Sequence, residues 1–173
     1  RFVAPGAMTV AVPVGMFFNP LRTGREEIDR LGAEAVALTH GAPQAFLTGG
    51  VLAHMISRII WDGARDLKEL VKEAVGALEE GFGREYRQVN EVRDGLNMAL
   101  RLAASHNVSC SDAMEHLRCT TAPEILAGAV YTALCYEHNF DEAMITAVNH
   151  SGRSAAVGAV TGAILGARLG EEA

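Results

Sequence analysis

The sequence predicts an all-α protein, a compact multi-helix bundle formed by a single domain over residues 1–173. Apolar residues recur at three- and four-residue spacing along most of the chain, and capping patterns precede many of these segments. We find no convincing alternation of apolar and polar residues that would indicate a strand. Aromatic residues make up only 6% of the chain, while Ala and Gly are abundant. This composition favours closely packed helices over a β-sandwich, so we expect about eight helices.

The first helix is expected over residues 7–18, with an interruption at Pro13, because proline lacks the amide proton that a helix interior needs. Thr23 and Glu26 form a capping-box pattern that predicts the start of a second helix. Its buried stripe is expected to comprise Ile28, Leu31, Ala35 and Leu38. Pro43 suits the first turn of a third helix, which we expect to end near residue 60.

The next segment is strongly amphipathic. Asp66 with Glu69 predicts its N-terminus, and a break is expected at residues 81–83. Its buried stripe is expected to comprise Leu67, Leu70, Val71, Ala74 and Leu78. A further helix is expected over residues 89–104. The remaining helix starts are predicted at Ser111, Thr121, Asn139 and Gly152.

The last helix contains four glycines, Gly158, Gly162, Gly166 and Gly170, at intervals of four residues. This spacing places them on one face. Each glycine destabilises a helix by about 1 kcal/mol relative to alanine. We therefore expect that face to be buried against neighbouring helices at the centre of the bundle.

Charge and cysteine usage exclude several classes of protein. The net charge is −6 and no cluster of Lys and Arg is present, so we expect no nucleic-acid partner. Cys110, Cys119 and Cys135 are dispersed and indicate a reducing, cytoplasmic location. The most apolar stretch, residues 154–167, is shorter than the roughly 20 residues of a membrane span, so we expect no membrane association.

Three segments carry a resemblance to one family. The first segment is GAMTVA at residues 6–11, followed by Pro13. The second comprises LGAEA at residues 31–35 and THGAP at residues 39–43. The third comprises AVNHSG at residues 147–152, GAVTG at residues 158–162 and ILGA at residues 164–167. In order and spacing these resemble the ADP-ribosylglycohydrolase family and cover the chain from end to end. The resemblance places the chain in the C-terminal part of such a helical domain. Because the chain begins at Arg1 rather than Met, we expect an upstream segment or a second chain to complete the fold.

The resemblance implies hydrolysis of the N- or O-glycosidic bond of ADP-ribose beside two Mg²⁺ ions. The family's C-terminal metal ligands lie in a G-D-[ST]-D-[ST] motif at the start of the last helix. In this sequence Arg153, Ala155 and Ala156 occupy the three ligand positions. An arginine has no acceptor atom and repels a cation, whereas Mg²⁺ needs oxygen ligands. We therefore expect no bound metal, no cofactor and no catalytic residue in this chain.

The resemblance also implies ligand-binding residues at Gly6, Ala7, Met8 and His40, and we add Arg153 as a candidate from its chemistry. Ala4 and Pro5 replace family residues that let the backbone approach phosphate, so the nucleotide loop is altered as well. His40 has two interpretations, proximity to ADP-ribose and a structural role in its turn. Arg153 is either a solvent-exposed or salt-bridged side chain, or a guanidinium that fills the space of the family's metals and meets a phosphate or remaining carboxylates. Glu124 is interpreted as the third residue of a capped helix.

Three functions remain open at this point. The first is a catalytically silent member of the family that binds ADP-ribose or a related nucleotide. The second is an ADP-ribosyl hydrolase whose active site comes from the upstream region. The third is a structural or interaction protein.

Overall fold

The computed structural model describes residues 6–64, 66–105 and 107–170. Across these residues the chain is helical and contains no strand, which confirms the predicted all-α class. The elements are the 3-10 helix η1 (Ala7–Ala11), α1 (Val12–Phe17), α2 (Pro20–Thr23), α3 (Arg25–Ala37), α4 (Pro43–Asp62), α5 (Leu67–Phe82), α6 (Val89–Ala103), α7 (Cys110–Leu117), α8 (Ala122–Cys135), α9 (Phe140–Val148) and α10 (Ser154–Leu169).

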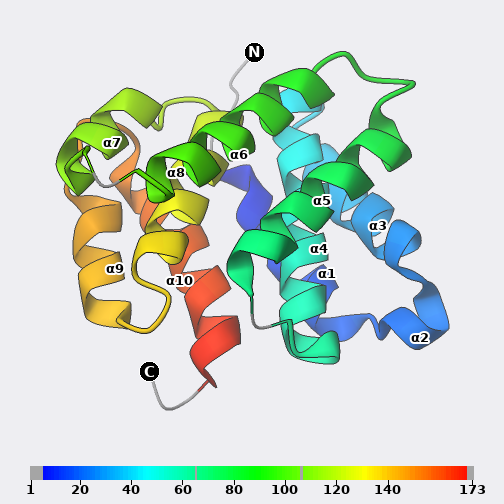
Figure 1. Ribbon diagram of the computed structural model, residues 1–173. Coiled ribbons are helices and arrows are strands. Elements are labelled where there is room, and N and C mark those ends of the chain that lie inside the picture. The colour runs from blue at the N-terminus through cyan, green and yellow to red at the C-terminus, as the bar shows by residue number, and fades with distance from the viewer. Residues whose placement is uncertain (1–5, 65, 106, 171–173) are drawn as a thin grey trace.

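Two helices, α4 and α8, form the centre of the bundle (Figure 1). Helix α4 contacts η1, α1, α3, α5 and α10, while α8 contacts α6, α7, α9 and α10. Most residues of both helices are buried, α8 is rich in Ala, and α4 carries the adjacent glycines Gly49 and Gly50. Small side chains allow close approach: a Cβ atom on Gly32 of α3 would lie 2.9 Å from the carbonyl oxygen of Gly49 on α4.

Several capping predictions are confirmed. The Asp66 side chain accepts a hydrogen bond from the Glu69 amide, and Asn139 does the same for Glu142. Thr121 opens α8 with a complete capping box in which Glu124 is the third residue. The stripe predicted for α5 is buried as expected. Local capping chemistry therefore sets these helix starts.

Two predicted helix starts are wrong. Thr23 ends the short helix α2, and α3 is preceded by Gly24, whose φ of +83° suits glycine. Helix α7 is capped by Ser109 rather than started by Ser111, because the Ser109 hydroxyl accepts from the Asp112 amide. Pro13 lies in the first turn of α1. The interruption predicted at Pro13 therefore falls just before it, where the 3-10 helix η1 gives way to α1.

The buried faces of α3 and α10 also differ from prediction. Leu38 is 87% exposed, and the buried residues of α3 are Ile28, Asp29, Gly32, Ala33 and Val36. In α10 only Gly158 and Gly162 lie against another helix, where they face Met144 of α9. A Cβ atom on Gly166 or Gly170 would meet nothing within 4 Å, so the predicted continuous glycine contact is absent there.

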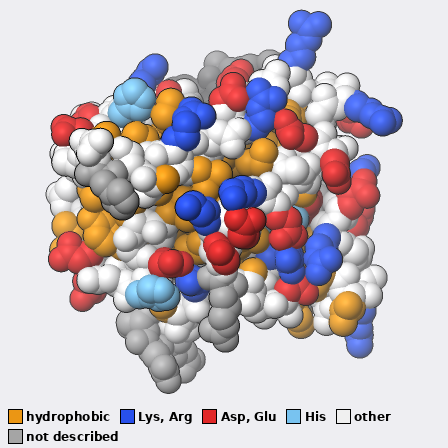
Figure 2. Space-filling view, in the orientation of Figure 1, with side chains coloured by type: hydrophobic (Ala, Val, Ile, Leu, Met, Phe, Trp, Pro, Cys, Tyr) orange, Lys and Arg blue, Asp and Glu red, His pale blue; other side chains and the backbone are white. Residues whose placement is uncertain are grey.

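The outer surface is mixed in charge on the face drawn in Figure 2. Lys and Arg side chains are interspersed with Asp and Glu over α3, α4 and α5. Among the described helices, none is both long enough and apolar enough to cross a membrane.

Candidate functional site

The start of α10 packs against the turn that joins α7 to α8. The Arg153 amide donates a hydrogen bond of 2.9 Å to the Cys119 carbonyl oxygen. A Cβ atom on Gly152 would lie 2.8 Å from that oxygen and closer still to the carbonyl oxygen of Arg118. The turn itself is unusual, because Arg118 and Cys119 have positive φ angles of 61° and 51°. A glycine at residue 152 is thus required by close backbone approach.

The backbone donors before α10 are used within the protein. The amide of Ser151 donates to Glu115 Oε1 (2.8 Å), and that of Gly152 to His150 Nδ1 (3.0 Å). The Ser154 and Ala156 amides donate to the carbonyl oxygens of Gly152 and Arg153. An anion at a helix N-terminus is bound through free amide groups. Most such groups here already have an acceptor.

Two carboxylates, Glu115 and Glu124, lie in this region and are both engaged. The Ser151 hydroxyl and amide donate to Glu115, and these hydrogen bonds hold the pKa of Glu115 below its usual range. Burial alone would raise the pKa of Glu124, but hydrogen bonds from Thr120 and Thr121 hold it below its ordinary value. Both carboxylates therefore serve to join loops to helices.

The predicted loop residues at the other end of the chain meet α10. A Cβ atom on Gly6 would lie 3.4 Å from the Cβ atom of Ala156, so the structure brings these two predicted positions together. Ala7 and Ala42 pack against the same small buried cluster. Met8 is 1% exposed and belongs to the main core, which gives its side chain a packing role. Ala4 and Pro5 lie outside the described residues.

His40 follows the C-terminus of α3. Its amide donates to the Val36 carbonyl oxygen (2.9 Å), and its ring Nδ1 lies 2.8 Å from the Thr39 hydroxyl. The ring is partly exposed. Ala42, two residues after His40, and Ala7, next to Gly6, pack against one small buried cluster. The structural role of His40 in its turn is thus visible in these contacts.

The Arg153 side chain is exposed at the N-terminus of α10. Its exposure leaves the guanidinium accessible to an anion from solution. Neither Ala155 nor Ala156 offers a side-chain oxygen, and Ser154 is the nearest hydroxyl in the first turn. The start of α10 therefore offers one guanidinium and one side-chain hydroxyl, and no carboxylate.

The arrangement does not fit a Mg²⁺ centre. Among the described residues, no group of three or more His, Cys, Asp or Glu side chains is placed to hold a metal ion. Burial, together with the charges of Glu124 and Glu115, raises the pKa of Cys119 to about 12, which disfavours its thiolate form at neutral pH. Mg²⁺ requires several oxygen ligands. At the start of α10, the described residues supply no side-chain carboxylate for such an ion.

The ligand-binding residues expected from the sequence are Gly6, Ala7, Met8, His40 and Arg153, and the structure places Gly6 beside the first turn of α10, which follows Arg153. Sequence reasoning expected Glu124 only as the third residue of a capped helix, and the capping box confirms this. It did not anticipate that Glu115 and the Arg118–Cys119 turn would support the start of α10. No sequence pattern near Ser151 indicates a partner 36 residues away, so only the fold reveals this contact.

Comparison with known proteins identifies the family. The model of the ADP-ribosylglycohydrolase family matches residues 3–173, which is nearly the whole chain. No match was found among curated proteins or among solved structures. Because this match covers far more than half of the chain, the chain belongs to the ADP-ribosylglycohydrolase family.

Proposed function

We propose that this chain is a non-catalytic member of its family, which binds an anionic nucleotide such as ADP-ribose without Mg²⁺. The observation that carries the proposal is the first turn of α10, where Arg153, Ala155 and Ala156 stand at the family's ligand positions. A guanidinium there favours phosphate and disfavours a divalent cation. Glu115 and Glu124 do not compensate, because each already accepts hydrogen bonds from the protein.

The binding mode follows from the charges. Arg153 is exposed and can donate in a bidentate way to a phosphate oxygen pair. The Gly6 segment lies beside Ala156, so a ligand held by Arg153 would also approach the backbone near Gly6. We expect His40, two residues before Ala42, to add a polar edge to the same ligand.

The test is a titration of the purified chain with ADP-ribose, with and without MgCl₂, by calorimetry. The proposal expects weak saturable binding that is independent of Mg²⁺ and is lost in Arg153→Ala. The matched control is Arg101→Ala, an arginine in the last turn of α6. Release of ADP-ribose from an ADP-ribosylated peptide, measured alongside, should stay at the background rate. Hydrolysis that requires Mg²⁺ would refute the proposal and support a working enzyme.

An interaction role is a second candidate, favoured by three large apolar side chains on the surface. Phe17, Leu21 and Leu38 are 78%, 92% and 87% exposed. Exposed apolar side chains mark a protein–protein contact where they adjoin one another. Light scattering of the wild type and of a Phe17→Ser, Leu21→Ser variant would test this role. A monomer that binds no nucleotide in the first experiment and forms no assembly in the second would exclude both candidates.

A further inference from the structure

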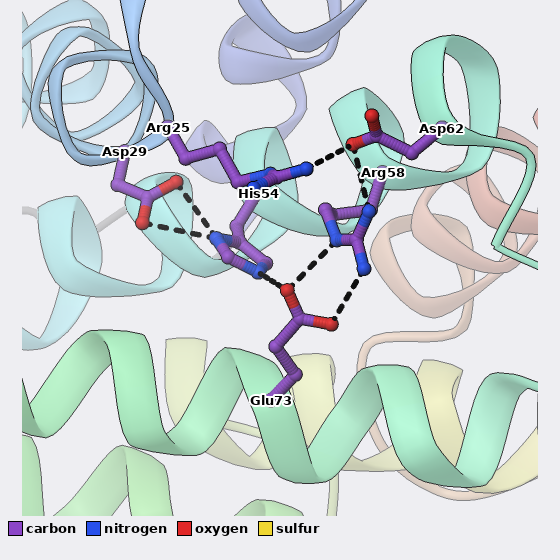
Figure 3. Close-up of polar contacts among 6 residues, drawn as sticks. All are labelled: Arg25, Asp29, His54, Arg58, Asp62 and Glu73. Carbon is purple, nitrogen blue, oxygen red and sulfur yellow. Dashed lines mark hydrogen bonds and ion pairs between the residues drawn. The ribbon is translucent and has the colours of Figure 1, made fainter. Parts of the chain in front are cut away.

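A cluster of charged side chains joins α3, α4 and α5 (Figure 3). The Arg58 guanidinium lies 2.7 Å from a carboxylate oxygen of Asp62 and 2.8 Å from one of Glu73, and His54 Nδ1 lies 3.0 Å from Asp29. Each of these groups has a partner inside the cluster, which holds the three helices together. The sulfur-containing side chains between α7 and α8 form a cluster of a different kind, because two of them are thiols with their own chemistry.

One face of α7 packs along α8. The Met114 Sδ atom accepts a hydrogen bond of 3.6 Å from the Thr132 hydroxyl, and the Met114 Cε atom would lie 3.4 Å from a Cβ atom on Gly128. Cys110 precedes Met114 by one turn and shares its face of α7. The Tyr136 hydroxyl, just after the end of α8, donates to Cys110 Sγ at 3.1 Å. The two helices therefore run in opposite directions here, and Cys110 lies beside the C-terminal end of α8.

A second thiol, that of Cys135, lies at this end of α8. Cys135 is the last residue of the helix and follows Tyr131 by one turn, so the two side chains share a face. The Tyr131 hydroxyl forms hydrogen bonds with the thiols of both Cys110 and Cys135, and the two thiols are in hydrogen-bonding contact with each other. The fold thus brings two cysteine sulfurs together from opposite ends of the α7–α8 pair.

The three cysteines differ in their access to solvent. Cys110 and Cys135 are free thiols and partly exposed, whereas Cys119 is 0% exposed. A reagent in solution can therefore reach Cys110 and Cys135 but not Cys119. The high pKa of Cys119 also disfavours the thiolate, which is the reactive form of cysteine. Cys119 is therefore an internal control for any reaction at the other two.

We propose that Cys110 and Cys135 form a site of reversible oxidation, at which a hydroperoxide converts the two thiols to a disulfide. In the first step, one thiol attacks the peroxide, the O–O bond breaks, and a sulfenic acid and one water form. In the second step, the other thiol attacks the sulfenic sulfur, so that the S–S bond forms while the S–O bond breaks. The hydroxide leaves with the proton of the second thiol as another water. The two thiols lose two electrons, and the peroxide gains them.

Contact between the two sulfurs favours the second step over competing reactions. A sulfenic acid that has no thiol beside it is oxidised further or reacts with another molecule. Here the partner thiol is already in place, so the second step is intramolecular. A thiol such as glutathione returns the disulfide to the two free thiols by exchange.

The disulfide would fix the helix that supports the start of α10. Helix α7 lies at the outer edge of the bundle and contacts α6 and α8 (Figure 1). It also carries Glu115, which accepts hydrogen bonds from the amide and the hydroxyl of Ser151. A link between Cys110 and Cys135 closes a loop that contains all of α7, and it reduces the conformations open to the unfolded chain. Oxidation should therefore stabilise α7 and the contact that it makes before α10.

The experiment treats the reduced, purified chain with hydrogen peroxide at neutral pH. Remaining thiols are then trapped with N-ethylmaleimide in denaturant, and the peptides are mapped by mass spectrometry without reduction. We expect a monomer with a Cys110–Cys135 link and with maleimide on Cys119 alone, whereas the untreated chain carries maleimide on all three cysteines. Dithiothreitol should restore the untreated pattern. The extent of linking should not change on about tenfold dilution of the protein, because both thiols belong to one molecule.

Three products would overturn the proposal. They are a link that involves Cys119, covalent dimers as the main product, and sulfinic acid at Cys110 or Cys135 without a link. The matched variants Cys110→Ser and Cys135→Ser each remove one thiol from a partly exposed position and keep its size. Each should form no internal link and should leave a sulfenic acid on the remaining partner, which dimedone labels. An internal link that persists in either variant would also refute the pairing.

Thermal unfolding gives a second readout. Oxidation should raise the melting temperature of the wild type by roughly 5–10 °C, because the link constrains the unfolded chain. The same treatment should leave the melting temperature of Cys135→Ser unchanged. A wild-type melting temperature that stays the same or falls on linking would show that the disulfide forms only after α7 has moved on α8. That result would overturn the claim that the fold holds the two sulfurs ready to bond.

Discussion

A methyl group at residue 152 should destabilise the fold, because the start of α10 has no room for it. In Gly152→Ala the new Cβ atom would lie 2.8 Å from the Cys119 carbonyl oxygen and 2.9 Å from the Cys119 Cβ atom. Overpacking of this kind costs about 1–3 kcal/mol. Separating the two backbones would also stretch the hydrogen bond from Arg153 to Cys119, worth about 1 kcal/mol. We expect a total loss of about 3 kcal/mol in the free energy of unfolding.

Urea unfolding followed by far-ultraviolet circular dichroism measures this loss. The urea midpoint should fall, while the slope of the unfolding free energy against urea concentration should stay the same. This combination indicates a change in stability alone. For a chain of this size the melting temperature should fall by roughly 6–12 °C. Ala155→Gly at the same helix start is a useful comparison, because it adds no atom. A change below about 0.5 kcal/mol in Gly152→Ala would refute the close approach of the two backbones.

Three further predictions follow from particular contacts. Gly166→Ala should raise the free energy of unfolding by about 0.5–1 kcal/mol, because its Cβ atom meets nothing within 4 Å; a loss in thermal unfolding would show that this face is covered. Glu124→Gln should destabilise the protein at neutral pH. Since the folded pKa of Glu124 lies below its unfolded value, this difference should disappear as the pH falls through the folded pKa, and a difference that persists in acid would contradict the assignment. Arg58→Met should cost about 2 kcal/mol in urea unfolding by leaving Glu73 and Asp62 without their shared partner; an unchanged midpoint would show that the ion pairs are not formed in solution.

The fold class was predictable from the sequence because the relevant signals are local. Asp66, Thr121 and Asn139 cap the helices that follow them, and each cap depends only on residues within one turn. The stripe on α5 was also predictable, since one face of that helix is buried and the other is exposed.

The errors have long-range causes. Helix α3 buries the face that carries Gly32 because α4 approaches it at Gly49, and this contact outweighs the apolar character of Leu38. The glycines of α10 share one face, but α9 covers only the part near Gly158 and Gly162. The spacing of glycines along a helix shows which face they share. It does not show how much of that face a neighbouring helix covers.

The candidate site was predictable only in part, for the same reason. Arg153, Ala155 and Ala156 were recognised by their position in a local motif. The contact between Gly6 and Ala156 joins the two ends of the chain, and the support from Glu115 crosses from α7 to the loop before α10. Neither contact has a local pattern that could have indicated it.

The most direct test of the central claim is a calorimetric titration of the purified chain with MgCl₂, alone and in the presence of ADP-ribose. Relative to the family motif, two carboxylates are replaced and a guanidinium is gained, which is a change of three charge units against a cation. Mg²⁺ affinity grows with the negative charge and number of its oxygen ligands. We predict no saturable heat with the wild type under either condition. Saturable binding of one or two ions per chain, lost when residues 152–156 are changed, would contradict the account.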